Sequence, residues 1–209
     1  MKAVGREPMD AEKAVADEAT RSKRPARDRI FETAREMFYE RGIRAVGVES
    51  IAAEAGATKM SLYRNFPSKD ELVAEVLRDQ ARESWEWWDA AVALHPDDPR
   101  AQLEDLFDAF AEKACCTDAA FGCALSNAAI ELHEPDHPAR LVSVAHKHEM
   151  LARLLKLTAA AGAPDDELAN GLLILMEGGY LARVTLSHTG PVRSVARTAK
   201  ALIRGYLDD

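Results

Sequence analysis

The order of apolar and polar residues predicts that the chain is built from helices. Between residues 27 and 41, apolar side chains recur at the i, i+4, i+7 and i+8 spacing of one helix face, and Gly42 follows as a stop signal. The apolar positions of this face are Ile30, Ala34, Met37 and Phe38. We expect this helix to bury that face against a core.

Two short helices follow, and a glycine turn separates them. The first spans about 48–55 and meets Gly56, a residue type that favours helix ends. The second begins after Thr58, whose hydroxyl is placed to cap it, and stops before Pro67. Two short helices in this order, after a longer one, predict a helix-turn-helix unit.

A long fourth helix is expected to begin at Ser68 and to run to about Leu94, where the run HPDDP breaks the pattern. Later helices are expected near residues 99–115, 121–132, 138–161, 165–187 and 191–207. The sequence shows no convincing alternating strand pattern, so the predicted fold class is all-α. The predicted organisation is a disordered tail at 1–22, a helix-turn-helix domain at 23–70 and a helical domain at 71–209.

Charge is distributed unevenly between these parts. The 209 residues carry 27 Lys and Arg against 35 Asp and Glu, a net charge of −8. Residues 21–70 alone carry a net charge of +4, whereas residues 71–209 carry −10. Positive charge on a helix-turn-helix unit is typical of a DNA-binding module. Ordinary scatter of charges is the alternative explanation for so modest an excess.

Other composition features point to the cytoplasm. The longest apolar run, at 171–181, is shorter than the roughly 20 residues of a membrane span and carries Glu177. The first twenty residues lack the apolar middle of a secretory signal, so neither a membrane partner nor export is expected. Cys115, Cys116 and Cys123 are too few and too clustered for a disulfide framework, and reduced thiols are expected.

A set of residues across 27–77 has a specific order and spacing. Its members are Ile30, Ala34, Phe38, Gly42, Val48, Ile51, Ala52, Ala55, Gly56, Thr58, Leu62, Tyr63, Phe66, Lys69 and Leu72. The densest part is LYRNFPSKDEL at residues 62–72, and the set as a whole resembles the TetR family of bacterial transcriptional regulators. The resemblance implies an N-terminal three-helix DNA-binding domain and a C-terminal helical domain for ligand binding and dimerisation. It further implies a homodimeric repressor that a small-molecule effector releases from a near-palindromic double-stranded operator.

The third helix supplies the expected DNA contacts. Leu62 and Phe66, one helical turn apart, are expected to pin it to the core and to leave the opposite face for DNA. Candidates for contact with base edges or phosphates are Thr58, Lys59, Ser61, Tyr63 and Arg64. The resemblance implies that Tyr63, and Lys69 at the start of the fourth helix, grip the DNA backbone. The alternatives are a packing aromatic and a solvated surface charge.

Two departures from the family pattern lie close to these candidates. Val46 and Gly47 stand where hydroxyl residues are usual before the second helix, so a cap or a phosphate contact expected there is absent from the sequence. Asn65 stands where a histidine or tyrosine is frequent. The operator sequence is therefore not inferred from the resemblance.

The 165–187 helix is apolar on most of its circumference, so it must be covered on two sides. One side can face its own domain, and the other can face the same helices of a second copy. We therefore expect a homodimer through helices at about 165–187 and 191–207, with Gly178 and Gly179 permitting close approach. A monomer with this helix at its centre is the alternative.

Candidates for an effector site are aromatic, apolar and polar residues on the fourth to eighth helices. They are Trp85, Trp88, Phe107, Phe110, Asn127, Met150, Met176, Glu177 and Tyr180. Core or dimer packing is the alternative for each of them. Glu177 is the sharpest case, because a carboxylate in an apolar helix is unfavourable unless it is paired or protonated. Its expected partner is a cationic effector, Arg183, a backbone donor or the dimer seam.

Catalysis is not expected. Glu134 and His137 have the Glu-x-x-His spacing of di-iron bundles, but Pro135 and Pro138 place them in a loop and no second such motif exists. The sequence predicts no catalytic residue, no metal site and no cofactor. A helical-bundle metal enzyme, and a helical adaptor that has lost DNA contact, are the alternatives to a DNA-binding regulator.

Overall fold

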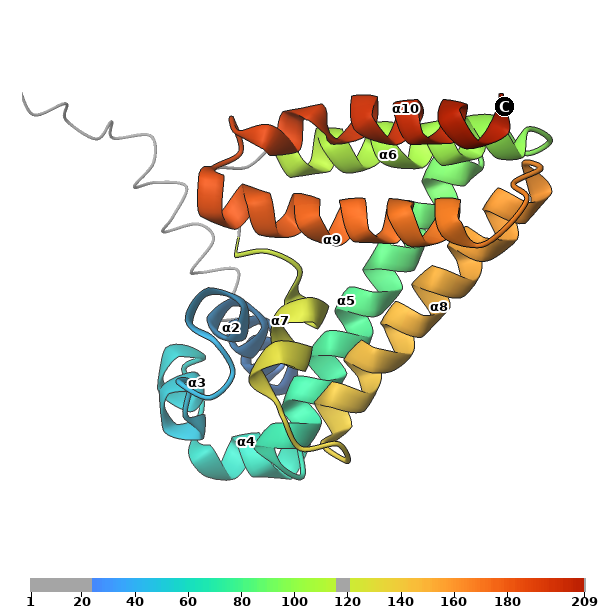
Figure 1. The fold of residues 1–209 in the computed structure, drawn as a ribbon. Coiled ribbons are helices and arrows are strands. Elements are labelled where there is room, and N and C mark those ends of the chain that lie inside the picture. The colour runs from blue at the N-terminus through green and yellow to red at the C-terminus, as the bar shows by residue number, and fades with distance from the viewer. Residues whose placement is uncertain (1–23, 116–120, 209) are drawn as a thin grey trace, which may run out of the picture. The chain divides into compact units, whose positions relative to one another are not determined.

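A computed structural model describes residues 24–115 and 121–208 of the chain. Within these ranges the chain forms helices and no strand, which confirms the all-α class (Figure 1). The predicted tail at 1–22 and Cys116 lie outside the described residues.

The helices pack into two units, of which the first ends at Val76 and the second begins at Leu77. This division falls inside helix α5, which spans Lys69–Val92 as one continuous helix. The functional boundaries at 22/23 and 70/71 are a separate matter and stay predictions.

The first unit contains α2 (Ala26–Arg41), α3 (Val48–Glu54), α4 (Lys59–Asn65) and the first turns of α5. Gly42 ends α2 with a φ of 85°, and Gly56 has a φ of 58° in the turn between α3 and α4. Glycine adopts positive φ at no steric cost, which explains both stops. Helices α2, α3 and α4 all contact one another, as a helix-turn-helix unit requires.

The second unit contains the rest of α5 and the later helices. Their bounds are α6 (Pro99–Cys115), α7 (Ala124–Glu131), α8 (Pro138–Ala160), α9 (Glu167–Leu186), the short 3₁₀ helix η1 (Pro191–Ser194) and α10 (Val195–Leu207). The sequence predicts α6 to the residue. The predicted bounds differ from the structure for α7, which begins at Ala124 rather than at 121. They also differ for the predicted helix at 191–207, whose first residues form η1.

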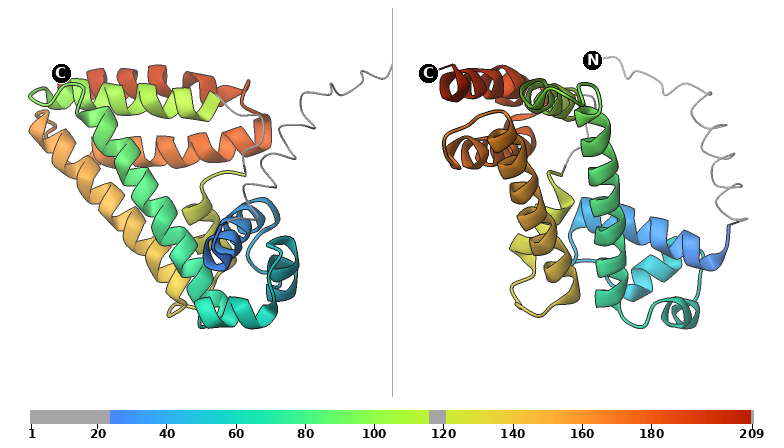
Figure 2. Two further views of the ribbon diagram at one scale, coloured as in Figure 1. Left: turned by 180° about the vertical axis from the view of Figure 1, so that it is seen from behind. Right: turned by 90° about the vertical axis from the view of Figure 1, so that its right-hand side faces the viewer.

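Within this unit, α10 lies beside both α6 and α9, and α8 lies beside α7 and α9 (Figure 1). Figure 2 shows the same neighbours from behind, with the second half of α5 running along α8. An ion pair of 2.8 Å between Arg153 of α8 and Asp89 of α5 links these two helices. The buried faces of α5, α6, α8, α9 and α10 enclose one hydrophobic core.

Candidate nucleic-acid interface

Helix α4 starts where the sequence predicts it to start. The side chain of Thr58 accepts a hydrogen bond from the backbone N–H of Ser61 at 3.1 Å, which satisfies one of the donors left open at a helix start. Ser68 does the same for α5 by accepting from the N–H of Glu71 at 3.0 Å. Local hydroxyl caps therefore fix the starts of both α4 and the helix that follows it, α5.

Arg29 of α2 holds the turn that leads into α4. Its Nε donates to the carbonyl of Ala55 and its Nη2 to that of Gly56, both at 3.0 Å. A second arginine, Arg41, pairs with Glu54 of α3 at 3.2 Å. No local motif identifies Arg29, because its two acceptors lie 26 and 27 residues further along the chain and the contact depends on the fold.

The two faces of α4 differ sharply. Leu62 is fully buried and Phe66 is 1% exposed, which confirms that this pair anchors the helix. The opposite side, called here the exposed face of α4, comprises Lys59, Met60, Tyr63 and Arg64. These positions follow the i, i+1, i+4, i+5 pattern of one helix side. The exposed face therefore combines two cationic side chains, an aromatic hydroxyl and a thioether.

Ser61 and Met60 differ from the sequence-based expectation. Ser61 is proposed above as a DNA contact, but its side chain is 8% exposed and lies on the buried side with Leu62. Met60 is absent from the predicted set, yet it is 79% exposed. The 3.6-residue period explains both, because Met60 lies one turn before Tyr63 and Arg64, whereas Ser61 lies one turn before Asn65.

The two lysines of the predicted set have internal partners. Lys59 forms an ion pair with Glu49 of α3, and this carboxylate raises the pKa of Lys59 while the ammonium lowers that of Glu49. Lys69 is half-buried, and its Nζ donates to the carbonyl of Ile43 at 2.6 Å. Lys69 thus ties the start of α5 to the segment after α2, a role that the sequence did not predict.

Arg64 stands apart from these lysines. It is exposed, and it makes no ion pair within residues 24–115 and 121–208. Tyr63 is 43% exposed. A guanidinium and a phenol in this position can donate to phosphate oxygens, and the guanidinium can donate to the major-groove edge of guanine.

The two unusual residues before α3 have structural uses. Val46 is 2% exposed and fills the core of the first unit. Gly47 precedes α3 without a side-chain cap, and Ser50 donates its hydroxyl to the Gly47 carbonyl at 2.7 Å. A hydroxyl is therefore present one turn later than the family pattern places it.

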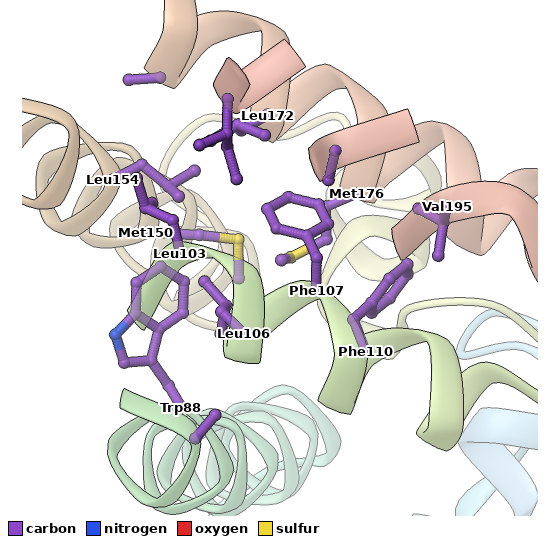
Figure 3. Close-up of a cluster of buried hydrophobic side chains, with 14 of the residues drawn as sticks. Trp88, Leu103, Leu106, Phe107, Phe110, Met150, Leu154, Leu172, Met176 and Val195 are labelled. Atoms are coloured by element: carbon purple, nitrogen blue, oxygen red, sulfur yellow. The ribbon is translucent and has the colours of Figure 1, made fainter. Parts of the chain in front are cut away.

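In the second unit, five of the predicted effector residues are core residues. Figure 3 shows Trp88, Phe107, Phe110, Met150 and Met176 converging in one cluster, and each is at most 3% exposed. Trp85 and Tyr180 are partly buried against the same cluster. Asn127 is exposed, donates to the Phe121 carbonyl and is not a member of this cluster.

Glu177 has partners that the sequence did not predict. It accepts from the Ser126 hydroxyl at 2.7 Å and from the Lys147 ammonium at 2.5 Å. Lys147 also lies 3.5 Å from the Sγ of Cys123, which is a free thiol. This partly buried group joins α7, α8 and α9, and it supplies the pairing that a carboxylate in an apolar helix needs.

His146 is a buried polar side chain in the same unit. It is 4% exposed, its ring lies 4.3 Å from that of Trp85, and neither ring nitrogen has a partner among the described residues. Burial, with a smaller effect from Lys147, lowers the pKa of His146 to about 4. The imidazole is therefore neutral at physiological pH.

A groove of about 620 Å³ lies between α5, α6 and α8. Of the predicted effector residues, Trp88 lines it, together with Gln102, Arg153, Lys156 and Leu157 among others. Arg153 lies over the Trp85 ring at 4.0 Å and also pairs with Glu149 at 3.0 Å. Half of its lining residues are apolar and half are polar or charged, and its volume lies in the range of small-molecule sites.

The described residues contain no group of three or more His, Cys, Asp or Glu side chains that could hold a metal ion. His137, from the Glu-x-x-His segment, accepts from the N–H of Ala139 at 3.2 Å and so caps α8. Among the described helices, none has the length and apolar character that a membrane span requires.

Comparison with known proteins gives a local and an extended match. The family model "Bacterial regulatory proteins, tetR family" matches residues 30–76. The HTH-type transcriptional repressor KstR2 of Mycolicibacterium smegmatis is 47% identical over 53 residues, which cover 25% of this chain and 26% of that protein. The match thus spans about a quarter of that relative's length.

More distant relatives align along most of the chain. The HTH-type transcriptional regulator UidR of Escherichia coli is 25% identical over 194 residues, covering 88% of this chain and 93% of its own length. A crystal structure of a TetR-family transcriptional regulator from Streptomyces coelicolor superposes with a TM-score of 0.76 at 28% identity, covering 88% and 95% of the two chains. Relatives and structural neighbours of this family are regulators and not enzymes. The chain thus matches the TetR family of bacterial transcriptional regulators in residues 30–76, and it is similar to regulators of this family along most of its length.

Proposed function

We propose that this DNA-binding regulator acts as a homodimeric repressor, which places α4 of each copy in the major groove of a near-palindromic operator. A small-molecule effector would bind the second unit and release the DNA. The observation that carries the proposal is the exposed face of α4, which presents Lys59, Tyr63 and Arg64 while Leu62 and Phe66 hold the helix from behind. Such a regulator would act in the cytoplasm.

Dimerisation is supported by the outer side of α9. Ile174 is 71% exposed and Leu181 is 64% exposed, and Gly178 lies between them on the same side of the helix. We call these three residues the apolar stripe of α9. A Cβ added to Gly178 would meet no atom within 4 Å, so a second helix can approach there. The same stripe on two copies can pair about a twofold axis.

Gly179, in contrast, belongs to the chain's own core. A Cβ added there would lie 2.7 Å from the Phe110 ring, too close for any side chain. The two neighbouring glycines thus serve opposite sides of α9, with Gly178 toward the proposed partner and Gly179 toward Phe110.

The effector part of the proposal rests on the second unit. The groove between α5, α6 and α8 has the volume of a small-molecule site, and Trp88 of the predicted set lines it. The predicted residues that are not fully buried are further candidates, namely Trp85, Asn127, Glu177 and Tyr180. Because α5 is continuous from Lys69 to Val92, a ligand that moves its second half can act on its first turns. The effector must bind the DNA-incompetent arrangement more tightly than the DNA-competent one. A ligand with equal affinity for both states would not change the equilibrium between them.

DNA binding is tested by gel shift of the full chain with DNA from upstream of its own gene, at several salt concentrations. We expect a complex whose affinity falls steeply with salt, because phosphate contacts release counterions. Arg64→Ala should weaken the complex, either with a flatter salt slope if Arg64 contacts phosphate or with relaxed preference at one base pair if it contacts guanine. Arg193→Ala, an exposed arginine of the second unit, is the matched control and should change neither.

The adaptor alternative makes the opposite prediction. A helical protein that has lost DNA contact would show no salt-sensitive complex with any DNA, and Arg64→Ala would then behave like Arg193→Ala. Either result would contradict the proposal.

A further inference from the structure

Most polar groups on and around α4 are already engaged within the protein. Lys59 is paired with Glu49, and the Thr58 side chain accepts from the N–H of Ser61. Asn65 donates its Nδ2 to the Ser61 carbonyl at 2.7 Å, and Ser61 itself is buried. Of the exposed face of α4, Met60, Tyr63 and Arg64 therefore supply a large share of the surface that a partner can contact.

Met60 is the most exposed of the large apolar residues in the described chain, at 79%. It lies three and four positions before Tyr63 and Arg64, so its side chain emerges from the same side of α4 as theirs. A single exposed apolar residue on a protein surface needs no explanation. This one, however, lies on the face proposed to enter the major groove.

The chemistry of a thioether limits what Met60 can recognise there. It has no hydrogen-bond donor and only a weak acceptor, so the polar edges of the bases offer it little. The apolar group that B-DNA presents in the major groove is the C5-methyl of thymine. An unbranched, polarizable methionine can adapt its shape to such a group.

We propose that Met60 is a specificity-determining residue, which selects thymine in each half of the operator by packing against its C5-methyl group. This inference rests on the proposed function, because it requires α4 to enter the major groove. It adds a contact that depends on apolar shape to the donor contacts of Arg64 and Tyr63. Each half-site must accordingly contain a thymine whose replacement by deoxyuridine lowers the binding affinity.

The test begins with an operator selected from random DNA by the full-length protein. Each thymine of the half-sites is then replaced by deoxyuridine, which removes a methyl group and keeps every hydrogen-bonding group. Removing one buried methyl contact should weaken binding about fourfold per half-site and more than tenfold when both halves are changed. The affinities are measured by fluorescence anisotropy at constant salt.

The variant Met60→Ala completes a thermodynamic cycle. Alanine favours the helix and the position is exposed, so the fold is retained. Met60→Ala should bind the thymine operator more weakly than the wild type, and deoxyuridine should cause it no further loss. Ile130→Ala removes a side chain that is 72% exposed on α7, and as the matched control it should keep the wild-type response to deoxyuridine.

The outcomes separate this inference from the proposed function. Loss of affinity at one thymine per half-site, abolished by Met60→Ala, supports it. Strong salt-sensitive binding without any thymine in the half-site, or with equal affinity for thymine and deoxyuridine at every position, overturns the inference alone. Equal sensitivity of wild type and Met60→Ala to deoxyuridine also overturns it. Failure to select any DNA overturns the proposed function and, with it, the role of Met60.

Discussion

Helices α4 and α9 each bury one side and expose the other, but their exposed sides have opposite chemistry. On α4 the exposed face carries Lys59, Tyr63 and Arg64 beside Met60, whereas on α9 the exposed stripe consists of Ile174, Gly178 and Leu181. Both helices are anchored by fully buried leucines, Leu62 in α4 and Leu172 in α9.

The difference shows how exposed chemistry distinguishes two kinds of partner. A face of donors and positive charge suits a polyanion, and it adds little by hydrophobic burial. A stripe of exposed aliphatic side chains with a glycine between them gains free energy by being covered, at about 25 cal/mol per Å² of apolar surface. This contrast is the basis on which we propose DNA as the partner of α4 and a second copy of the chain as the partner of α9.

The largest expected effect is on the α9 side. Leu181→Glu should weaken the dimer by about 5 kcal/mol, because each of two copies loses the burial of a leucine and gains a carboxylate in an apolar interface. Sedimentation velocity at micromolar concentration should show a folded monomer in place of the wild-type dimer. Ile130→Glu places the same charge at an exposed apolar position of α7 and should remain dimeric. A dimer of unchanged affinity in Leu181→Glu would show that the stripe is not the interface.

The second-largest effect is expected for substitutions on the buried side of α4. Phe66→Ala should lower the free energy of unfolding of the first unit by about 4 kcal/mol, since it removes a buried aromatic ring and leaves a cavity. DNA binding should be lost with it. Met60→Ala, on the exposed side of the same helix, should change stability by less than about 0.5 kcal/mol. Urea denaturation measures both, and equal effects from the two variants would contradict the division of α4 into two faces.

A smaller effect is expected in the interior of the second unit, where the buried His146 makes the stability depend on pH. The folded chain holds the pKa of His146 at about 4, below the ordinary value of 6.5, through burial and secondarily through Lys147, with Arg153 acting in the same direction and Glu177 and Glu149 against it. Between these two values the unfolded chain binds a proton that the folded chain does not. Stability should therefore fall as pH falls, by about 2 kcal/mol from pH 7 to pH 5.

His146→Leu is the variant that tests this assignment. It removes two buried ring nitrogens without partners and should be more stable than the wild type at pH 7, by about 1 kcal/mol. Its loss of stability between pH 7 and pH 5 should be smaller by the contribution of the histidine. An unchanged pH dependence, measured by urea denaturation at fixed protein concentration, would show that His146 is not the responsible group.

The smallest effect concerns the start of α4. Thr58→Ala removes the side-chain acceptor for the Ser61 N–H and should lower stability by about 1 kcal/mol, whereas Thr58→Ser should keep most of it. Thermal denaturation distinguishes the two. If alanine and serine had the same effect, the cap would contribute nothing measurable.

Local signals explain why the helices were predictable from the sequence. Gly42 and Gly56 stop helices because positive φ suits glycine, and Thr58 and Ser68 start them because their hydroxyls satisfy nearby backbone donors. Each signal acts within a few residues. The anchoring role of Leu62 likewise follows from the helical period alone.

Contacts between distant segments explain which features of the site the sequence does not predict. The bond from Lys69 to the Ile43 carbonyl joins residues 26 positions apart, and that from Lys147 to Glu177 joins residues 30 apart. No local pattern predicts which of several lysines meets a given acceptor. Ser61 differs from the prediction for another reason: its residue type suits DNA, but the helical period places it on the same side of α4 as Leu62 and Phe66.

Hydroxyl-radical footprinting of the wild-type protein on its selected operator tests both surfaces at once. If α4 enters the major groove and α9 pairs two copies, two protected segments should appear, related by the operator's symmetry and centred about 34–36 Å apart. A single protected segment of half that extent would contradict the dimer, and no protected segment would contradict the assignment of α4 to DNA.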